Sequence, residues 1–376
     1  MVSSLRERRV RLGTGDLCHA GSVTGERAWP GVSYVMPVLN EARYLAAAVE
    51  TVMAQDYPGE RELVLALGPS SDGTDAVAER LAAEDPRIRL VPNPGMDIPI
   101  GLNLAIAASR HDVVMRVDAH TQIPTEYTRI AVRALEESGA ANVGGLMLAT
   151  GETPLQRAVA RGYRSRIGLG GGSYHVGGEA GPTESAYLGV FRRDALEAVG
   201  GYDETLRRGE DWELNYRLRQ AGHLVWFDPA LQVTYWPRET WAKLARQFHS
   251  TGVWRGELVR RIGASNGVRF FVPPALVVAV ALSVLVGLAT AIVALVAAVP
   301  AWLAVVATLL GLAPLAYLLL LALAVVTTPG SLGDRLRFAG VIAVMHLAWG
   351  TGFLQGVVRG AGTNRDTSRS EGGPTR

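Results

Sequence analysis

Two short acidic segments carry residue types suited to chemistry on a phosphate- or hydroxyl-bearing substrate. The first, Asp118-Ala119-His120, directly follows the apolar run Val113–Val117. A carboxylate just past a buried strand can coordinate a divalent cation that bridges phosphate oxygens. The imidazole of His120 would be a better ligand for Mn²⁺ than for Mg²⁺. The alternative is that Asp118 and His120 cap the next turn, and the tripeptide alone leaves both interpretations open.

The second segment, Glu210-Asp211-Trp212-Glu213, opens a helix that the sequence predicts over Trp212–Gln220. Acidic residues at this position are explained by N-capping and by the favourable interaction of negative charge with the helix dipole. They are equally explained by a general base, a carboxylate held beside an acceptor hydroxyl to take its proton. The segment alone does not separate the two.

A glycine-rich run, Gly168-Leu169-Gly170-Gly171-Gly172-Ser173, lies ahead of Glu184-Ser185-Ala186-Tyr187. Glycine allows backbone to approach a substrate closely, and it also makes a loop mobile. We interpret the run as a mobile loop, and a loop that folds over a substrate satisfies both properties.

Strands and helices alternate through the first third of the chain, with polar loops after the strands. The predicted strands are Val32–Met36, Glu62–Leu67, Ile88–Val91 and Val113–Val117, and the predicted helices are Ala42–Ala54, Asp75–Ala83 and Ile100–Ser109. This alternation indicates an α/β domain, a mostly parallel sheet flanked by helices that binds ligands at the carboxyl ends of its strands. The first strand is followed by neither a Gly-x-Gly-x-x-Gly turn nor a phosphate loop, which disfavours a dinucleotide dehydrogenase and a P-loop ATPase.

The composition excludes several classes of protein. The 376 residues hold 37 basic and 35 acidic side chains, and a net charge of +2 does not support a nucleic-acid binder held by a broad basic field. Cys18 is the single cysteine, so the chain is not a disulfide scaffold. Charged residues make up 19% and hydrophobic residues 48%, so the excess hydrophobicity must be concentrated somewhere.

That hydrophobicity lies near the C-terminus, where no charged residue occurs between Arg269 and Asp334. Such a run is about twice what one bilayer crossing needs. We expect three membrane-spanning helices within residues 270–358, at Phe271–Val299, Trp302–Val326 and Phe338–Val358. Residues 1–30 contain arginines but lack the continuous apolar core of a secretory signal. The chain is therefore expected in the cell membrane as a multi-pass protein whose catalytic domain is cytoplasmic.

Basic residues next to the spans agree with this orientation. Residues 238–269 contain seven basic and two acidic side chains directly before the first span. Their alternation with tryptophan and leucine predicts an amphipathic helix in the headgroup layer, the alternative being a surface helix packed on the globular domain. Three spans would place the tail, residues 359–376, outside, and its arginines conflict with the same positive-inside rule.

Five motifs in register resemble the membrane-anchored family-2 glycosyltransferases, which are inverting enzymes with the GT-A fold. The matching residues are Met36-Pro37-Val38-Leu39-Asn40-Glu41, Ser71-Asp72-Gly73-Thr74, Arg116-Val117-Asp118-Ala119-His120, Gly200-Gly201-Tyr202-Asp203-Glu204 and Gly209-Glu210-Asp211-Trp212-Glu213. The resemblance covers about residues 31–262, with the GT-A domain itself at 31–237, and is greatest to the succinoglycan-type glucosyltransferase branch. It implies transfer of a sugar from a nucleotide-diphosphate donor, a UDP-hexose, to a membrane lipid-linked saccharide in exopolysaccharide or cell-envelope glycan synthesis.

The resemblance also implies a role for each matching residue. Asp211 would be the catalytic base, and Asp118 with His120 would bind a Mg²⁺ or Mn²⁺ ion. The residues implied to bind the donor nucleotide are Pro37, Asn40, Glu41, Asp72 and Asp118. The residues implied on the acceptor or diphosphate side are Glu210, Trp212, Gln247, Trp254 and Arg255.

The sequence departs from the family at two places. Leu67 ends the second strand where relatives often carry an Asp that reads the base, and the spacing around Gln247 and Arg255 differs from that of processive relatives. Two alternatives stay open: a polyprenyl-phosphate sugar transferase, whose acceptor is the lipid phosphate itself, and an inactive membrane scaffold that keeps the GT-A fold.

Overall fold

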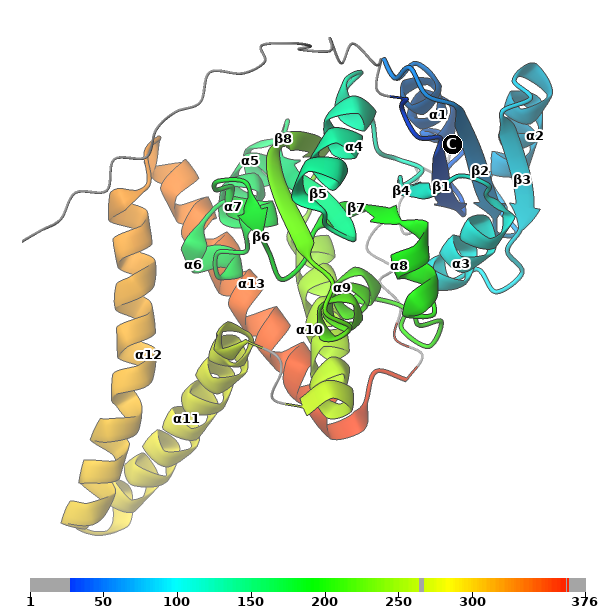
Figure 1. Cartoon of the computed structure of the whole chain (residues 1–376). Coiled ribbons are helices and arrows are strands. Elements are labelled where there is room, and N and C mark those ends of the chain that lie inside the picture. The colour runs from blue at the N-terminus through cyan, green and yellow to red at the C-terminus, as the bar shows by residue number, and fades with distance from the viewer. Residues whose placement is uncertain (1–27, 264–266, 363, 365–376) are drawn as a thin grey trace, which may run out of the picture.

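The computed structural model describes residues 28–263, 267–362 and 364. The predicted leader therefore lies outside the described residues apart from 28–30, as does most of the predicted tail. The described chain forms a globular α/β domain with long helices beside and below it (Figure 1).

One mixed sheet organises the globular domain. Its order is β3-β2-β1-β4-β7-β5-β8-β6, in which β1 to β4 run parallel, and β7 is antiparallel to both β4 and β5. The strands are β1 (Val32–Val38), β2 (Arg61–Leu67), β3 (Ile88–Pro92), β4 (Val113–Arg116), β5 (Asn142–Ala149), β6 (Gly181–Pro182), β7 (Tyr187–Arg192) and β8 (Val225–Tyr235). The four predicted strands are confirmed to within two residues at each end.

Helices cover both faces of this sheet. They are α1 (Leu45–Met53), α2 (Thr74–Glu84), α3 (Ile98–Ala108), α4 (Tyr127–Ser138), α5 (Pro154–Tyr163), α6 (Arg166–Leu169), α7 (Ser173–Val176), α8 (Arg193–Ala198), α9 (Glu210–Gln220) and α10 (Trp241–Ile262). Strand residues alternate between two buried clusters: Tyr34 packs with α1 and α4, whereas Val35 packs with α3 and α9. Both faces of β1 are thus buried, as expected for a central parallel strand.

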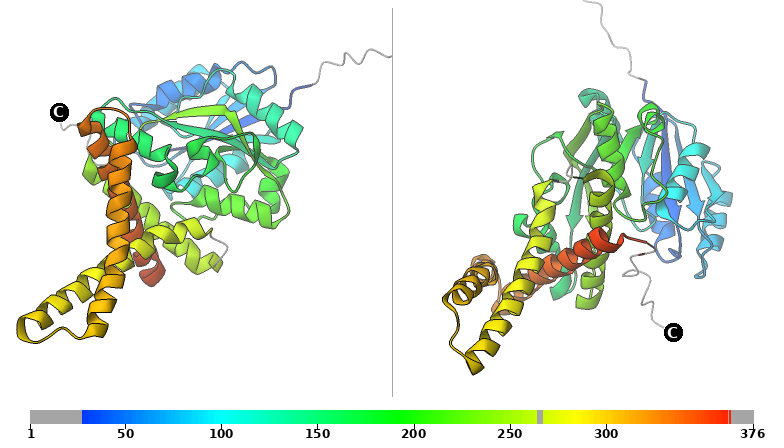
Figure 2. Two further views of the ribbon diagram at one scale, coloured as in Figure 1. Left: turned by 90° about the vertical axis from the view of Figure 1, so that its left-hand side faces the viewer. Right: turned by 90° about the horizontal axis from the view of Figure 1, so that it is seen from below.

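Three long apolar helices follow a short 3₁₀ turn, η2 (Val268–Phe271). They are α11 (Val272–Val296), α12 (Ala301–Thr327) and α13 (Leu332–Arg359), and each is long and apolar enough to cross a membrane. The α11–α12 hairpin extends away from the globular domain, whereas α13 runs alongside α10 (Figures 1 and 2).

Glycines let α10 and α13 pack backbone against backbone. Each helix carries two glycines four residues apart, Gly252 and Gly256 on α10 and Gly352 and Gly356 on α13. A Cβ atom at Gly352 would lie 2.1 Å from the His249 carbonyl oxygen, and one at Gly356 would lie 2.0 Å from that of Val253. Small residues at this spacing allow two helices to approach closely. The seam therefore fixes α13 on the globular domain.

We predict that Gly352→Ala lowers the thermal unfolding midpoint of the detergent-solubilised protein, because the added methyl group overlaps the α10 backbone. Overpacking of this kind costs about 1–3 kcal/mol. Gly311→Ala in α12 is the matched control, since a Cβ there meets no atom within 4 Å. Equal midpoints for the two variants at one scan rate would show that the seam is not closely packed.

Candidate active site

Four loops meet at the carboxyl edge of the parallel strands. They follow β1, β2, β3 and β4, and hydrogen bonds join the first two. The backbone N–H of Asn40 donates to Ser70 Oγ (3.1 Å), and its side-chain Oδ1 accepts from the Ser71 N–H (2.8 Å). Asn40 has a φ of 55°, in the left-handed region that asparagine tolerates better than most residues. Its side chain therefore shapes this edge of the sheet.

Asp72 locks the same two loops together. One carboxylate oxygen accepts from the Ala42 N–H (3.1 Å), and the other accepts from the N–H (3.1 Å) and hydroxyl (2.5 Å) of Thr74. Partial burial alone would raise the pKa of Asp72, but these hydrogen bonds outweigh it and hold the pKa below its usual value. The carboxylate is thus bound within the protein, and its contact with a nucleotide stays a prediction.

Arg116 lies at the centre of the site, surrounded by three carboxylates. Arg116 is 5% exposed. Nε donates to Asp118 Oδ1 (3.1 Å), and Nη1 donates to Glu210 Oε1 (3.1 Å) and to the carboxylate of Asp211. Burial alone would lower the pKa of Arg116, but the three carboxylates raise it well above its usual value, so the arginine stays charged. One positive charge against three carboxylates leaves the ionised cluster with a net charge of about −2.

Asp211 is not an N-cap, so the capping interpretation is wrong for this residue. The helix α9 begins at Glu210, and its N-cap is Gly209, with φ 79° and no side-chain capping bond. The pKa of Asp211 is raised to about 7, chiefly by burial. The negative charges of Glu210 and Asp118 also raise this pKa, and Arg116 lowers it in part. Because 31% of the side chain is exposed, water moderates this shift. A carboxylate of this kind is suited to accept a proton near neutral pH.

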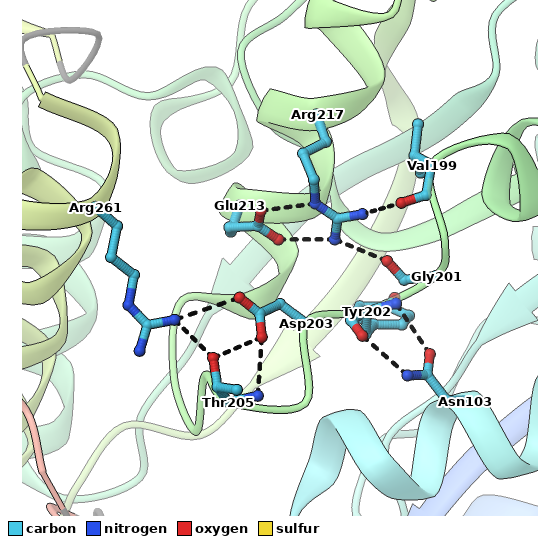
Figure 3. Close-up of polar contacts among 9 residues, drawn as sticks. All are labelled: Asn103, Val199, Gly201, Tyr202, Asp203, Thr205, Glu213, Arg217 and Arg261. Atoms are coloured by element: carbon cyan, nitrogen blue, oxygen red, sulfur yellow. Dashed lines mark hydrogen bonds and ion pairs between the residues drawn. The ribbon is translucent and has the colours of Figure 1, made fainter.

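The Gly200–Glu204 motif braces α9 from one side (Figure 3). Arg217 on α9 pairs with Glu213 (2.7 Å) and donates to the carbonyl oxygens of Val199 and Gly201, the latter at 2.7 Å. Asn103 on α3 donates to the Tyr202 carbonyl and accepts from the Tyr202 N–H, both at 2.9 Å. The motif therefore links α3 to α9.

Two further contacts fix α9 and the loop that precedes it. Arg261 on α10 pairs with Asp203 (3.3 Å) and donates to Thr205 Oγ1 (2.6 Å), as Figure 3 shows. Buried Asn215 on α9 accepts from the Asn142 side chain (2.6 Å) and donates to Ser185 Oγ (3.1 Å). Held by the sheet, α3 and α10, the start of α9 has little freedom to move away from Arg116.

Asp118 and His120 fit a divalent cation that a diphosphate would share. His120 Nδ1 lies 2.9 Å from Glu41 Oε1, an arrangement that orients the imidazole and leaves Nε2 as a ligand atom. The described residues contain no cluster of three His, Cys, Asp or Glu side chains able to hold a metal by themselves. Mg²⁺ in proteins is often bound by one or two carboxylates plus substrate phosphates and water. The net negative charge around Arg116 favours such a cation.

Arg255 lies over the ring of Trp212, the residue that follows Asp211 in α9. The Arg255 guanidinium lies 4.4 Å from the ring centroid of Trp212 and 4.0 Å from that of Phe270. Burial lowers the pKa of Arg255 to about 10; Tyr174 and Glu184 raise it, and Arg269 lowers it further. The site thus has a cation enclosed by aromatic rings next to the candidate base.

Trp254 and Gln247 face protein neighbours. Trp254 is 3% exposed, packs against Trp212 and Leu206, and donates its indole N–H to the Asn364 carbonyl (3.1 Å). Gln247 lies about two helical turns before Arg255 and donates to the Tyr235 hydroxyl (2.8 Å). Of the five residues implied on the acceptor side, Glu210 and Trp212 flank Asp211 in the chain, and Arg255 stacks on Trp212. Trp254 supports Trp212, and Gln247 lies toward the start of α10.

The glycine-rich run forms two short helices, α6 and α7, joined by a turn. Gly170 and Gly171 have φ values of 71° and 83°, which other residues rarely adopt. The turn lies against Arg269, whose guanidinium pairs with Glu184 (2.5 Å). Burial raises the pKa of Tyr174 on α7, and Arg255 and Arg269 lower it in part. The run therefore lies close to Arg269 and Arg255.

Sequence reasoning missed two residues of the site. Arg116 belongs to the Arg116–His120 motif, but the resemblance implies no role for it. An arginine inside an apolar strand, Val113–Val117, nevertheless signals a buried ion pair. Asn93, which follows β3, is 3% exposed, and its Oδ1 has no hydrogen-bond partner among the described residues. Gly101 makes room for it, since a Cβ there would lie 2.7 Å from Asn93 Nδ2.

Comparisons with known proteins agree with this geometry. Residues 33–200 match the model of glycosyl transferase family 2. The chain is 34% identical over 244 residues to the succinoglycan biosynthesis protein ExoA of Rhizobium meliloti (strain 1021), covering 64% of this chain and 74% of that protein. A Methanococcus voltae protein is 23% identical over 239 residues, covering 61% of this chain and 74% of its own length. Its name is dolichyl N-acetyl-alpha-D-glucosaminyl phosphate 3-beta-D-2,3-diacetamido-2,3-dideoxy-beta-D-glucuronosyltransferase.

A solved structure shows the same fold over most of the chain. The mannosyltransferase PcManGT from Pyrobaculum calidifontis, in complex with GDP-Man and Mn²⁺, matches with a TM-score of 0.51 at 17% identity, covering 84% of this chain and 86% of that one. The predicted fold class and the prediction of an enzyme are confirmed, and the scaffold alternative loses its basis. With 74% of a 34%-identical relative matched, and with the fold and motif residues in place, the chain belongs to glycosyl transferase family 2 and is a glycosyltransferase.

Proposed function

We propose that the chain transfers a hexose, with inversion, from a nucleotide-diphosphate donor, a UDP-hexose, to a membrane lipid-linked saccharide in exopolysaccharide or cell-envelope glycan synthesis. The observation that carries the proposal is the cluster around Arg116. It places a carboxylate suited to a metal, Asp118, and a carboxylate suited to a proton, Asp211, on one guanidinium.

The donor would lie over the carboxyl edge of β1 to β4. Pro37 lies near the end of β1, and Asn40 and Glu41 lie in the loop after it, which Asp72 holds in place. Asp118 and His120 would hold a Mg²⁺ or Mn²⁺ ion, which when bound stabilises the negative charge of the leaving diphosphate. Glu41 would act on this side by orienting His120.

Transfer would be a single displacement. The acceptor hydroxyl oxygen forms a bond to the anomeric carbon of the donor sugar while the bond from that carbon to the diphosphate oxygen breaks. The hydroxyl proton passes to Asp211, and the electron pair of the broken bond leaves with the nucleoside diphosphate. Arg116 holds the Asp211 carboxylate in place, and its positive charge lowers the basicity of that carboxylate. The negative charge of Glu210 nearby offsets part of this effect.

The acceptor would approach from the membrane side. Phe270, which stacks on Arg255, lies in the turn directly before α11. A lipid carrier beside α11 would thus bring its phosphate groups toward Arg255 and its sugar toward Asp211. The name of the Methanococcus voltae relative, a transferase acting on a dolichyl-linked sugar phosphate, supports a lipid-linked acceptor. The name of the succinoglycan biosynthesis relative supports polysaccharide synthesis. The basic residues 238–269 support a cytoplasmic catalytic domain.

A radiolabelled donor screen tests the proposal directly. Membranes containing the protein are given UDP-, GDP- and TDP-hexoses together with either polyprenyl monophosphate or a polyprenyl-diphosphate sugar. We expect label from a UDP-hexose in extractable lipid with the diphosphate-linked sugar as acceptor. Labelling of the monophosphate alone would identify a polyprenyl-phosphate sugar transferase instead.

We predict that Asp211→Asn slows transfer by at least about 100-fold, the scale of a lost general base, while donor binding and the unfolding midpoint stay near wild type. Asparagine keeps the volume of the side chain and can still accept the hydrogen bond from Arg116. The matched control is Glu84→Gln on α2, whose loss of the exposed Arg80 ion pair should leave turnover nearly unchanged. Near-normal turnover in a folded Asp211→Asn protein would refute the assignment.

We further predict that a chelator abolishes transfer and that Mn²⁺ or Mg²⁺ restores it. Asp118→Asn should weaken the binding of UDP in the presence of the cation, measured by calorimetry, as well as turnover. Asp85→Asn, which removes an ion pair with Arg87 elsewhere on the surface, is the control and should change neither. Full activity in excess chelator would contradict the role of Asp118 and His120.

Arg255→Ala should raise the KM for the lipid acceptor about tenfold or more, because a hydrogen bond to a charged group contributes about 1.5–3 kcal/mol. The Kd for the donor nucleotide should stay unchanged. Arg260→Ala on the same helix, where the arginine pairs with Glu257 at the surface, is the control. An equal loss of donor affinity in Arg255→Ala would place this arginine on the donor side.

A further inference from the structure

The helix α13 is apolar enough to cross a membrane, yet it contacts the globular domain from one end to the other. Before its first turn, Arg161 of α5 donates to the Pro329 carbonyl (3.0 Å). At its middle, His346 Nε2 lies 2.7 Å from the Ile167 carbonyl of α6. Just past its end, the Ala361 N–H donates to Glu257 of α10 (3.2 Å). A helix crossing the bilayer would carry one of its ends away from the domain.

Burial separates α13 from the other two long helices. The most apolar 18-residue window is 0% buried in the first candidate span, which contains α11, and 6% buried in α12, but 39% buried in α13. Lipid-facing helices bury little within the protein, which fits α11 and α12. In α13, Val341 and Met345 belong to the same buried cluster as Leu244 of α10 and Val159 of α5.

The glycine seam sets the depth of α13 in the membrane. Because the backbones of α10 and α13 touch at Gly252 and Gly352, the two helices share one environment. Charged side chains are spread along α10, among them Lys243, Arg260 and Arg261, and Arg261 pairs with Asp203 of the globular domain. Charges of this kind are costly in the hydrocarbon core. Since α10 stays out of the core, α13 must do so as well.

The outer face of α13 is nevertheless largely apolar. Leu336, Leu347 and Val358 are exposed at spacings that place them on one side of the helix, and the uncharged polar Thr351 and Gln355 are exposed among them. An apolar stripe next to the basic segment 238–269 suits the boundary between headgroups and acyl chains. Arg359 and the tail arginines Arg365, Arg369 and Arg376 would then lie on the cytoplasmic side, in agreement with the positive-inside rule.

We propose that α11 and α12 alone cross the membrane, and that α13 lies along the cytoplasmic surface of the bilayer with its outer face in the lipid, returning the C-terminus to the side of the catalytic domain. The proposal rests on the membrane attachment proposed above, and it holds whatever sugar the enzyme transfers. It replaces the three-span arrangement expected from hydropathy with two spans and one surface helix.

Cysteine accessibility in the full-length chain tests the orientation. Cys18 is replaced by serine, and single cysteines are introduced by Ala298→Cys, between α11 and α12, and by Ser368→Cys in the tail. A membrane-impermeant thiol reagent is applied to spheroplasts and to inverted vesicles. We expect residue 298 to react in spheroplasts and residue 368 to react in inverted vesicles. Reaction of both positions in spheroplasts would establish three crossings, and reaction of neither there would refute the α11–α12 hairpin; both results overturn the proposal.

Depth in the bilayer distinguishes a surface helix from a spanning one. Leu347→Cys, near the middle of α13, and Leu285→Cys, near the middle of α11, are spin-labelled in proteoliposomes, and collision with oxygen and with a polar nickel reagent is compared. The label at 347 should report the headgroup boundary and the label at 285 the bilayer centre. Equal depths would refute the surface position of α13, whereas donor hydrolysis or transfer by the same preparation shows separately whether the enzyme is active.

Discussion

The buried guanidinium of Arg116 is the interaction on which the site depends. It joins residues at the end of β4 to the first turn of α9, which lie more than ninety positions apart in the chain. Breaking one partner of a buried ion pair costs about 3–5 kcal/mol, because the remaining charge is left without compensation. Here the removal of Arg116 would leave three carboxylates, Asp118, Glu210 and Asp211, facing one another. The two halves of the proposed reaction, leaving-group stabilisation and proton removal, are therefore held at a fixed separation by one side chain.

The sequence predicted the first four strands and the helices between them because their signals are local. Alternating apolar residues and turn-forming loops show where each element begins and ends, and parallel pairing then brings Asn40, Asp72 and Asp118 to one edge. The antiparallel β7, inserted between β4 and β5, was not predicted, since pairing partners far apart in sequence leave no periodic trace. The apolar strand around Arg116 signals that its charge must be paired, but its partners Glu210 and Asp211 lie 94 and 95 positions away, so local reasoning could not name them.

The status of Asp211 shows where local reasoning misleads. An acidic residue at the start of a helix is normally assigned to capping, and Asp211 fits that pattern in sequence. In the structure Gly209 takes the cap position, with a positive φ that lets the chain turn into the helix without any side-chain cap. The Asp211 carboxylate lies in the first turn of α9 and pairs with Arg116 instead of capping the helix. The tertiary contact thus excludes capping, and the role of a general base stays a prediction.

Hydropathy has a similar limit at the C-terminus. It indicates that a segment is buried from water, but it does not show whether the segment is buried in lipid or against other parts of the protein. The α10–α13 seam depends on Gly252, Gly256, Gly352 and Gly356, and glycine contributes little to a hydropathy average.

The packing of α10 against α13 has a consequence for the enzyme. On one side α10 carries Arg255 and supports Trp212 beside Asp211, and on the other it is fastened to α13 along its length. Phe270 and Trp349 stack with ring centroids 6.3 Å apart, so the base of α11 is tied to the same assembly. With α13 on the membrane surface, the height of Asp211 above the bilayer is set by packed helices and not by a flexible linker. An enzyme whose acceptor sugar stands a fixed distance from its lipid anchor needs that height to be constant.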